Sequence, residues 1–465
     1  MGGLPARTLF AIGIYVLGAG IARGWWDSCD ATPCRSPGSR PTSAPTLGDD
    51  GPSPAGPAPE WPQFHGPRRD NLSTETGLLK RWPEGGPPLV WKADGLGHGF
   101  SSVAIAHGRI YTAGNLDRQT VITALDLAGK RLWQAPNGPA YERSYPGARS
   151  TPTFAAGKLY HLNGDGDVVC LDSRSGQRIW TLNMPEKFGG RTTTWGLSGS
   201  LLVDGRNLIC CAGGEKVAVV ALDRDTGKTV WTCTGLGEKP GYGSPVLVEC
   251  GGLRQIVTMM AASAVGIAAD TGRLLWRYPH KVAMDVNVAT PIYRDGHLAI
   301  FGTWGRGATL LRLNVRGDAC TAEEVWRTPE LDNEHGGVVL VDGYLFGQAD
   351  GNHRKRHWAC LDWKTGKTMY SVEGLPTQRS GSVTCAEGMI YAVSDLGEVA
   401  LVPASPRAFE IVSQFRLPTA GNDPAWAHPV VCGGRLYLRH KDTLYAYDVR
   451  ATKTPSYTHS EASPP

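Results

Sequence analysis

The apolar residues of this chain come in short runs, each separated from the next by a tight polar turn. Segment 219–231 shows the unit: small and apolar residues at 219–222, a turn from Asp223 to Gly227, and a second strand that ends in Trp231. An Asp side chain can accept backbone N–H groups two residues on, and Gly supplies the positive φ that so short a connection needs. The pattern predicts a β-hairpin, and related hairpins occupy residues 124–133, 170–180, 268–276 and 360–370.

The spacing of these hairpins predicts the fold. From Asp126 onward the turn aspartates follow one another after 46, 51, 47 and 92 residues, and the last interval is two periods; the missing copy lies near residues 311–326. Each hairpin is preceded by a strand of the form Gly-x-apolar-Tyr, and before it by a strand that often begins with Ser or Thr followed by Pro. One period thus holds four strands, and four antiparallel strands repeated radially make a β-propeller blade.

We therefore predict an all-β fold, an eight-bladed β-propeller of four-stranded antiparallel blades. No outer strand follows Asp448, whereas segment 89–92 offers one from the other end of the chain. We expect this N-terminal strand to complete the last blade and close the ring, which removes an open sheet edge. The predicted blade centres lie near residues 110, 160, 210, 258, 300, 346, 391 and 437.

The two ends of the 465-residue chain differ in composition from the part between them. An apolar run from Leu9 to Ile21 follows Arg7, which is typical of a signal peptide or an N-terminal anchor. We expect a protein exported to the periplasm or cell envelope, with an N-terminal membrane tether as an open alternative. The net charge of +4 is mild and does not indicate a nucleic-acid partner. The predicted parts are a signal peptide or anchor (1–24), a Pro/Ser/Gly-rich linker (25–60), the propeller (61–450) and a disordered tail (451–465).

The motif Ala-x-Asp-x-x-Thr-Gly-Lys-x-x-Trp at residues 221–231 resembles the tryptophan-docking repeat of the pyrroloquinoline-quinone-like (PQQ-like) propeller family. Five good copies at a regular period extend the resemblance over residues 61–450. The resemblance implies that the docking indoles form an outer girdle, each packed on the turn of the neighbouring blade. The implied structural tryptophans are Trp91, Trp133, Trp180, Trp231, Trp276 and Trp326.

The resemblance leaves function open. The family contains quinone-dependent dehydrogenases of alcohols and sugars, and also non-catalytic members such as the outer-membrane-assembly lipoprotein BamB. The docking tryptophans are common to both groups, so the fold alone does not choose between an enzyme and a scaffold.

A ligand site is expected where the loops before the innermost strands meet around the central channel. Arginines and aromatic faces there would suit a planar polyanion such as the quinone, and Asp285 with Asn287 would offer oxygen ligands to Ca²⁺. Asp285 is then also the candidate catalytic residue. The alternative is that these polar side chains only line a wet channel. The candidate cofactor-binding residues are Arg149, Arg191, Trp195, Asn287, His335, Arg379, Trp426 and His428.

Quinone-dependent alcohol dehydrogenases carry a disulfide between adjacent cysteines, which makes the pair Cys210-Cys211 a candidate feature. The pair lies in the strand-like segment 207–212, where neighbouring side chains point to opposite faces, a poor geometry for such a disulfide. We expect two buried thiols, and their redox state stays open. The short loops between blades would also leave little to exclude water from a hydride-transfer site.

These observations favour a monomeric binding or assembly scaffold like BamB, without catalysis or a cofactor, and with a protein or polysaccharide partner in the cell envelope. The alternative is a PQQ-dependent dehydrogenase that oxidises an alcohol or sugar and holds PQQ with Ca²⁺. A third interpretation is a carbohydrate- or peptidoglycan-binding module in which Trp195 and Trp426 are the stacking platforms. The sequence names neither the partner nor the substrate.

Overall fold

The computed structural model describes residues 59–350, 356–419, 421 and 423–451. The predicted signal peptide or anchor, nearly all of the predicted linker and the predicted tail from residue 452 onward lie outside this set. The chain divides into two units, Met1–Ser53 and Pro54–Pro465, and every described residue belongs to the second. Within the described part, no helix has the length and apolar character needed to cross a membrane.

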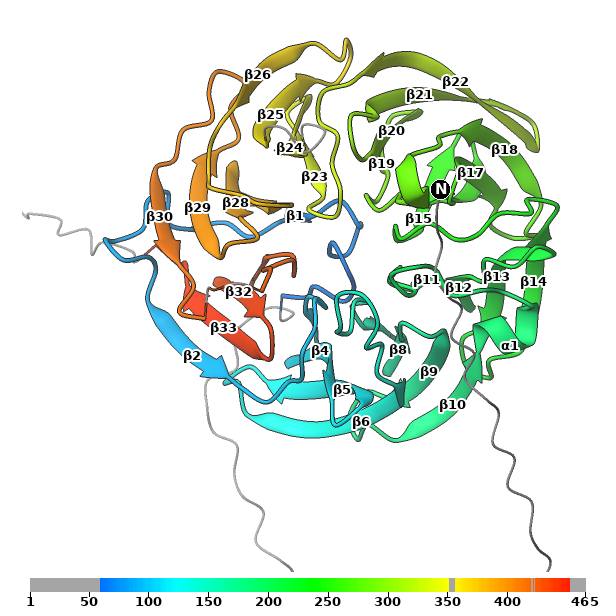
Figure 1. Ribbon diagram of the computed structural model, residues 1–465, viewed down its shortest axis with the longest axis horizontal. Helices are drawn as coiled ribbons and strands as arrows, with labels where there is room; N and C mark the ends of the chain where they lie inside the picture. The colour runs from blue at the N-terminus through cyan, green and yellow to red at the C-terminus, as the bar shows by residue number, and fades with distance from the viewer. Residues whose placement is uncertain (1–58, 351–355, 420, 422, 452–465) are drawn as a thin grey trace, which may run out of the picture. The chain divides into compact units, whose positions relative to one another are not determined.

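Eight β-sheets follow one another around a common axis (Figure 1), which confirms the predicted all-β propeller. Each predicted blade centre falls in the second strand of a sheet. Helices in the described residues are limited to α1 (Met184–Phe188) and the 3-10 turn η1 (Ala283–Asp285). The first four blades are β3 (Ala104–Ala106), β4 (Arg109–Leu116), β5 (Gln119–Asp126), β6 (Arg131–Pro139); β7 (Thr153–Ala155), β8 (Lys158–Leu162), β9 (Asp167–Asp172), β10 (Arg178–Asn183); β11 (Leu202–Asp204), β12 (Asn207–Cys211), β13 (Val217–Asp223), β14 (Thr229–Thr234); and β15 (Val246–Cys250), β16 (Leu253–Met259), β17 (Ser263–Ala268), β18 (Leu274–Pro279).

The N-terminal part of the chain contributes to the last two blades. Strand β2 (Leu89–Ala93) pairs antiparallel with β33 (Thr443–Asp448) as the outer strand of blade 8, as predicted, and β1 (Leu72–Ser73) adds a fifth, parallel strand to blade 7. The last four blades are β19 (Ile292–Arg294), β20 (His297–Gly302), β21 (Gly307–Arg316), β22 (Ala319–Thr328); β23 (Val338–Val341), β24 (Tyr344–Ala349), β25 (His357–Asp362), β26 (Thr368–Val372); β1 (Leu72–Ser73), β27 (Ser382–Ala386), β28 (Met389–Val393), β29 (Glu398–Pro403), β30 (Ser413–Arg416); and β31 (Val430–Cys432), β32 (Arg435–His440), β33 (Thr443–Asp448), β2 (Leu89–Ala93).

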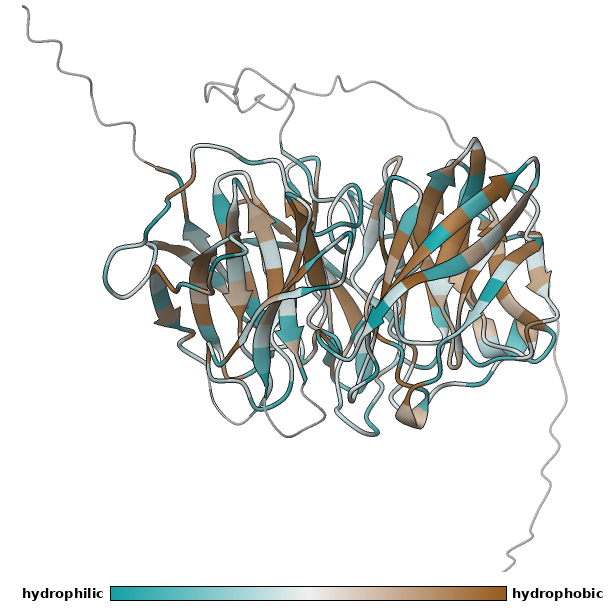
Figure 2. Cartoon of the chain, turned by 90° about the horizontal axis from the view of Figure 1, so that it is seen from above, coloured by the Kyte–Doolittle hydropathy of each residue, from teal (hydrophilic) through white to brown (hydrophobic). Residues whose placement is uncertain are grey.

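The hydrophobic core lies between the blades. Middle strands such as β13 and β17 are buried on both faces, because each sheet lies between two neighbouring sheets of the ring (Figure 1). Figure 2 shows long hydrophobic stretches along the strands in brown. Burial on both faces explains their continuous apolar runs, whereas the outer strands keep exposed positions. The main clusters of buried side chains each join two successive blades, and one joins blade 8 to blade 1. The packed interface between the last and the first blade closes the ring together with β2.

The repeated hairpin turns have the predicted local structure. At the turn between β13 and β14, Asp223 Oδ1 accepts the backbone N–H of Thr226 at 2.9 Å, and Gly227 has a φ of 70°. The indole of Trp180 from the preceding blade covers this glycine, where a Cβ atom would lie 2.9 Å from the ring. Glycine therefore serves both the turn conformation and the close packing of the indole.

The docking tryptophans join successive blades at the rim. Trp231 Nε1 donates to Ala269 O at 2.9 Å, and its ring covers Gly272 in the next turn. Trp276 differs: its Nε1 donates to Gln255 Oε1 of its own sheet at 2.7 Å, because the long hairpin β21–β22 replaces the usual turn in blade 5. The other indole N–H groups, of Trp91, Trp133, Trp180 and Trp326, donate to the carbonyls of Leu127, Ser173, Arg224 and Trp363 in the next blade.

Residues 61–73 run across the axis of the ring and contact blades on both sides of it (Figure 1). Trp61 exchanges two backbone hydrogen bonds with Ile105 in blade 1, while Leu72 pairs with Cys385 in blade 7. Between them, the buried Arg69 donates to the carbonyls of Ser200, Leu201 and Pro245 in blades 3 and 4. The segment thus forms a floor across the inner ends of the blades.

Candidate functional site

A cavity of about 520 Å³ lies where the connections between blades meet. These connections run from the outer strand of one blade to the inner strand of the next, the position predicted for a ligand site. Eight segments of this kind and the N-terminal floor contribute side chains. The principal lining residues are Phe64, His65, Phe100, Tyr145, Arg149, Trp195, Ser198, Ser200, Tyr242, Ser244, Met284, Trp304, Glu334, His335, Arg356, Gln378, Arg379, Trp426 and His428.

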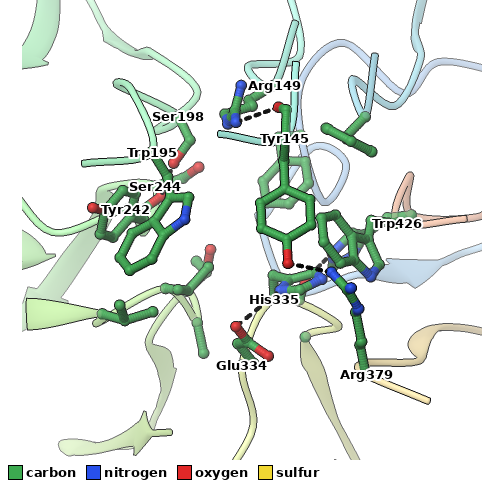
Figure 3. A pocket seen from close by; sticks show the side chains of 18 of the residues that line it. Tyr145, Arg149, Trp195, Ser198, Tyr242, Ser244, Glu334, His335, Arg379 and Trp426 are labelled. Carbon is green, nitrogen blue, oxygen red and sulfur yellow. Dashed lines mark hydrogen bonds and ion pairs between the residues drawn. The ribbon is translucent and has the colours of Figure 1, made fainter. Parts of the chain in front are cut away.

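Aromatic side chains form two groups on either side of this cavity (Figure 3). In one group the rings of Trp195 and Tyr242 lie 5.9 Å apart, centre to centre. In the other, the Trp426 ring lies 5.2 Å from Tyr145 and 4.3 Å from His335. Flat apolar faces on two walls suit a ligand that has apolar faces of its own.

Two arginines flank Tyr145. Arg149 donates to Tyr145 O at 2.6 Å and to Gly147 O at 2.7 Å, and its guanidinium lies 4.4 Å from the centre of the Tyr141 ring. Arg379 donates to the Tyr145 hydroxyl and lies 4.9 Å from the centre of that ring. Burial lowers the pKa of Arg149 to about 10, so the group stays charged at neutral pH. Neither arginine forms an ion pair with a described residue.

Three histidines form a chain on the floor side of the cavity. His65 Nε2 lies 3.0 Å from His428 Nδ1, and His428 Nε2 lies 2.6 Å from His335 O. A carbonyl only accepts, so His428 carries its proton on Nε2 and accepts at Nδ1 from the Nε2–H of His65. Burial is the main cause that lowers the pKa of His428 to about 4 and of His335 to about 3, and it lowers that of His65 well below the ordinary value. All three are therefore neutral at pH 7.

Several lining residues adopt backbone conformations that non-glycine residues rarely occupy. The φ angles are 64° for His65, 52° for Tyr145 and 52° for Trp304. His65 and Tyr145 lie outside the tight turns that close the hairpins within blades, whereas Trp304 lies in the turn between β20 and β21. Such conformations cost free energy of order 1–3 kcal/mol each and cluster at binding sites, where they aim side chains that ordinary backbone would not.

The Ser or Thr at the start of the innermost strand links neighbouring blades. The backbone N–H of Ser102 donates to Thr151 Oγ1 at 3.0 Å, that of Thr151 to Ser200 Oγ at 3.0 Å, and that of Ser200 to Ser244 Oγ at 2.9 Å. Each hydroxyl accepts from the equivalent residue of the preceding blade. This hydrogen-bonded row explains the repeated Ser/Thr-Pro signature, and it places the hydroxyls of Ser200 and Ser244 at the cavity wall.

Six of the candidate cofactor-binding residues line the cavity: Arg149, Trp195, His335, Arg379, Trp426 and His428. Two do not, and here the sequence-based expectation needs correction. The Arg191 side chain is 77% exposed, with Glu215 3.9 Å away. Asn287 is fully buried inside blade 4, where its side-chain amide donates to the carbonyls of Met260 and His280.

The proposed calcium ligands do not come together. Asp285 lies half-exposed in η1, and its neighbours Met284 and Val286 line the cavity in its place. Because the side chain of Asn287 is held inside the blade, the two residues cannot share an ion at the cavity. Ca²⁺ takes six to eight oxygen ligands, and no group of three or more His, Cys, Asp or Glu side chains in the described part of the chain is placed to hold a metal. The residues present do not fit a quinone–calcium site.

The adjacent cysteines lie in β12, and neither of them lines the cavity. Cys210 packs between blades 2 and 3, whereas Cys211 faces blade 4 with its Sγ 3.5 Å from Thr258 Oγ1. Both are free thiols, and burial raises the pKa of both. The two side chains point to opposite faces of the sheet, as expected from their place in a strand.

Sequence reasoning missed the contribution of the N-terminal segment. Phe64 and His65 line the cavity, yet they lie before the first copy of the repeat, where no periodicity marks them. Trp304 was missed because it sits in the hairpin between β20 and β21, not in a connection between blades. Its signal was a tryptophan next to Gly305 at a position where the other blades have no aromatic residue.

The fold and the cavity define an eight-bladed propeller with an aromatic, arginine-containing site on its axis. A family model described as "Outer membrane protein assembly factor BamB" matches residues 117–372, more than half of the chain, and the chain belongs to this family of PQQ-like propellers.

Curated relatives include both functional classes. The chain is 27% identical over 201 residues to the outer membrane protein assembly factor BamB of Burkholderia pseudomallei (strain K96243), an alignment that covers 43% of this chain and 46% of that protein. It is 29% identical over 123 residues to the dehydrogenase subunit of a quinone alcohol dehydrogenase of Komagataeibacter europaeus, covering 24% of this chain and 17% of that protein. The chain thus spans less than half the length of either.

Solved structures show the same fold. The crystal structure of BamB from Moraxella catarrhalis has a TM-score of 0.54 at 14% identity, covering 79% of this chain and 98% of that one. The quinohemoprotein alcohol dehydrogenase from Comamonas testosteroni has a TM-score of 0.58 at 13% identity, covering 85% and 81%. At such identities the likeness concerns the fold alone.

Proposed function

We propose that this protein is a non-catalytic binding scaffold of the cell envelope, which acts with a protein partner in the assembly of outer-membrane proteins. The family model and the Burkholderia relative both carry the description of an outer membrane assembly factor, which supports this proposal. The N-terminal apolar run of the sequence fits an exported protein. The propeller offers its partner eight rigid blades, and a fold closed at its ring needs no oligomer to cover an open edge.

The observation that carries the proposal is the composition of the cavity. Its described lining offers aromatic faces, hydroxyls and three arginines, all of which recognise ligands. Glu334 is the one carboxylate among the described lining residues. Of the two residues that a quinone-dependent reaction would use with Ca²⁺, Asp285 is not among the lining residues, and the Asn287 amide donates to the carbonyl of Met260.

The dehydrogenase alternative has support of a different kind, because a quinone alcohol dehydrogenase is among the relatives. That alignment covers 24% of this chain, and the repeat that fixes the blade structure is common to both classes. The dehydrogenase alternative therefore rests on the blade repeat that both classes share, whereas the composition of the cavity supports a role in ligand recognition.

The proposal is tested by deletion in the organism that carries the gene. Quantitative mass spectrometry of the outer membrane should show reduced amounts of its β-barrel proteins in the deletion strain, restored by the wild-type gene. An Asp285→Ala gene should restore them equally well, because Asp285 has no part in a scaffold. An unchanged outer membrane, together with lost growth on an alcohol or sugar as the carbon source, would overturn the scaffold proposal in favour of the dehydrogenase.

A further inference from the structure

The cavity has an excess of positive charge. Arg149 and Arg379 face it without an ion pair among the described residues, and Arg356 is matched by Asp350 at 3.2 Å. Two guanidinium groups against one carboxylate favour an anionic ligand, and a planar guanidinium pairs best with a carboxylate or a phosphate.

Both arginines retain donors for such a ligand. Arg149 donates to the carbonyls of Ser144, Tyr145 and Gly147, which leaves part of its five N–H groups to a ligand. Arg379 donates to the Tyr145 hydroxyl and is otherwise exposed at the cavity mouth. Tyr145, held at a φ of 52°, contacts Arg149 through its backbone carbonyl and Arg379 through its hydroxyl.

The opposite wall carries hydroxyl groups beside an aromatic face. Ser198 Oγ donates to Tyr242 O at 2.9 Å and keeps its lone pairs for a donor. Ser200 and Ser244 each accept a backbone N–H, and within the described residues neither donates its hydroxyl proton to a protein acceptor. Ser198 and Ser244 lie next to the Trp195 ring (Figure 3). The wall therefore offers both donors and acceptors at the edge of a stacking surface.

We propose that the cavity binds an acidic saccharide, a sugar with a carboxylate on its ring or on a ring substituent. The apolar C–H face of the sugar packs on Trp195 and Trp426, and its hydroxyls bond to the hydroxyls of Ser198, Ser200 and Ser244. Its carboxylate pairs with the exposed guanidinium of Arg379, and Arg149, at the other end of Tyr145, adds to the positive charge of the site. A neutral sugar would leave both guanidinium groups without a counter-charge. A planar aromatic acid has no hydroxyls that could bond to Ser198, Ser200 and Ser244. This proposal adds a ligand to the scaffold and does not depend on the identity of its protein partner.

The test is calorimetric titration of the full-length protein with digalacturonic acid, with the neutral disaccharide galactobiose as the matched ligand. We expect saturable binding of the acid and at least about tenfold weaker binding of the neutral sugar. Arg379→Gln should weaken binding of the acid about tenfold or more and leave the neutral sugar unaffected. Arg191→Gln, an exposed arginine outside the cavity, is the control and should bind as the wild type does.

Stacking is tested separately, because it should act on both ligands. Trp195→Ala should weaken the acid and the neutral sugar by similar factors, while Trp195→Phe keeps most of the affinity. A melting temperature equal to that of the wild type shows that the blades of each variant are folded.

Equal affinity for the two sugars, or no binding of either, would overturn the proposal. So would binding of a peptide through its C-terminal carboxylate in place of the saccharide. If the acid sugar does not bind but the deletion strain still has reduced outer-membrane β-barrel proteins, the saccharide proposal is rejected and the scaffold proposal stands.

Discussion

His65 Nε2 lies 3.0 Å from His428 Nδ1, and this contact joins the N-terminal segment to the loop before the last blade. The two residues are 363 positions apart in the sequence. The contact is buried, and Phe64 stacks beside it with its ring 3.8 Å from that of His65. The site is thus formed from both ends of the propeller, so the N-terminal segment belongs to the folded domain and to its cavity.

The buried histidines predict a loss of stability in acid. Burial holds the pKa of His428 at about 4 and that of His335 at about 3 in the folded protein, below the ordinary value of 6.5. Between about pH 4 and 6.5 the unfolded chain binds more protons than the folded one, so the free energy of unfolding falls as the pH falls. Above pH 6.5 these groups add no further pH dependence. Urea denaturation at a series of pH values measures the effect.

One variant isolates the contribution of the floor. His428→Gln should reduce the slope of stability against pH between 4 and 6.5, because the titrating group is gone. If this variant kept the full slope, the acid sensitivity would arise outside the histidine chain.

Arg69 is predicted to anchor the N-terminal segment. It is 4% exposed and donates to the carbonyls of Ser200, Leu201 and Pro245, so Arg69→Met leaves three buried acceptors without their donor. We expect a loss of at least about 3 kcal/mol in the free energy of unfolding. Limited proteolysis should also cut the segment faster. Arg68→Met, next to it but exposed, should change stability by less than about 0.5 kcal/mol; equal effects of the two changes would contradict the anchor.

Trp231 is predicted to stabilise the fold without taking part in ligand binding. Its indole is 7% exposed and joins blades 3 and 4, so Trp231→Ala should cost about 3 to 5 kcal/mol. The adjacent Val230 is 52% exposed, and Val230→Ala should stay within about 0.5 kcal/mol. Chemical denaturation compares them. A Trp231→Ala protein with the wild-type melting point would show that the docking contact does not hold the blades together.

The hydrogen-bonded row at the inner strands can be interrupted at one position. Ser200→Ala removes the acceptor of the buried Thr151 N–H, which should cost about 1–3 kcal/mol. Ser200→Thr keeps a hydroxyl, and the equivalent position of blade 2 is already Thr151, so this variant should retain most of the stability. Denaturation midpoints that fail to separate the two variants would mean that water replaces the hydroxyl.

The blade structure was predictable because its signals are local and repeated. A turn such as 223–227 carries its own Asp, Gly and period, and the place of the ligand loops follows from the ring. The direction of a single loop side chain is not local. Asn287 lies two residues after Asp285, yet its side-chain amide donates to the carbonyls of Met260, just after β16, and His280, just after β18. No periodicity in the sequence marks these contacts. For the same reason the sequence did not reveal that His65 reaches His428.

Titration of the purified full-length protein with PQQ in the presence of Ca²⁺ tests most directly whether the cavity is a recognition site and not a quinone site. A calorimeter measures the heat of binding, and a parallel assay follows reduction of an artificial electron acceptor after an alcohol or sugar is added. We predict no saturable heat and no reduction, because Asp285 and Asn287 do not face the cavity. Saturable binding that Ca²⁺ strengthens and Asp285→Ala weakens, together with reduction of the acceptor, would contradict the account.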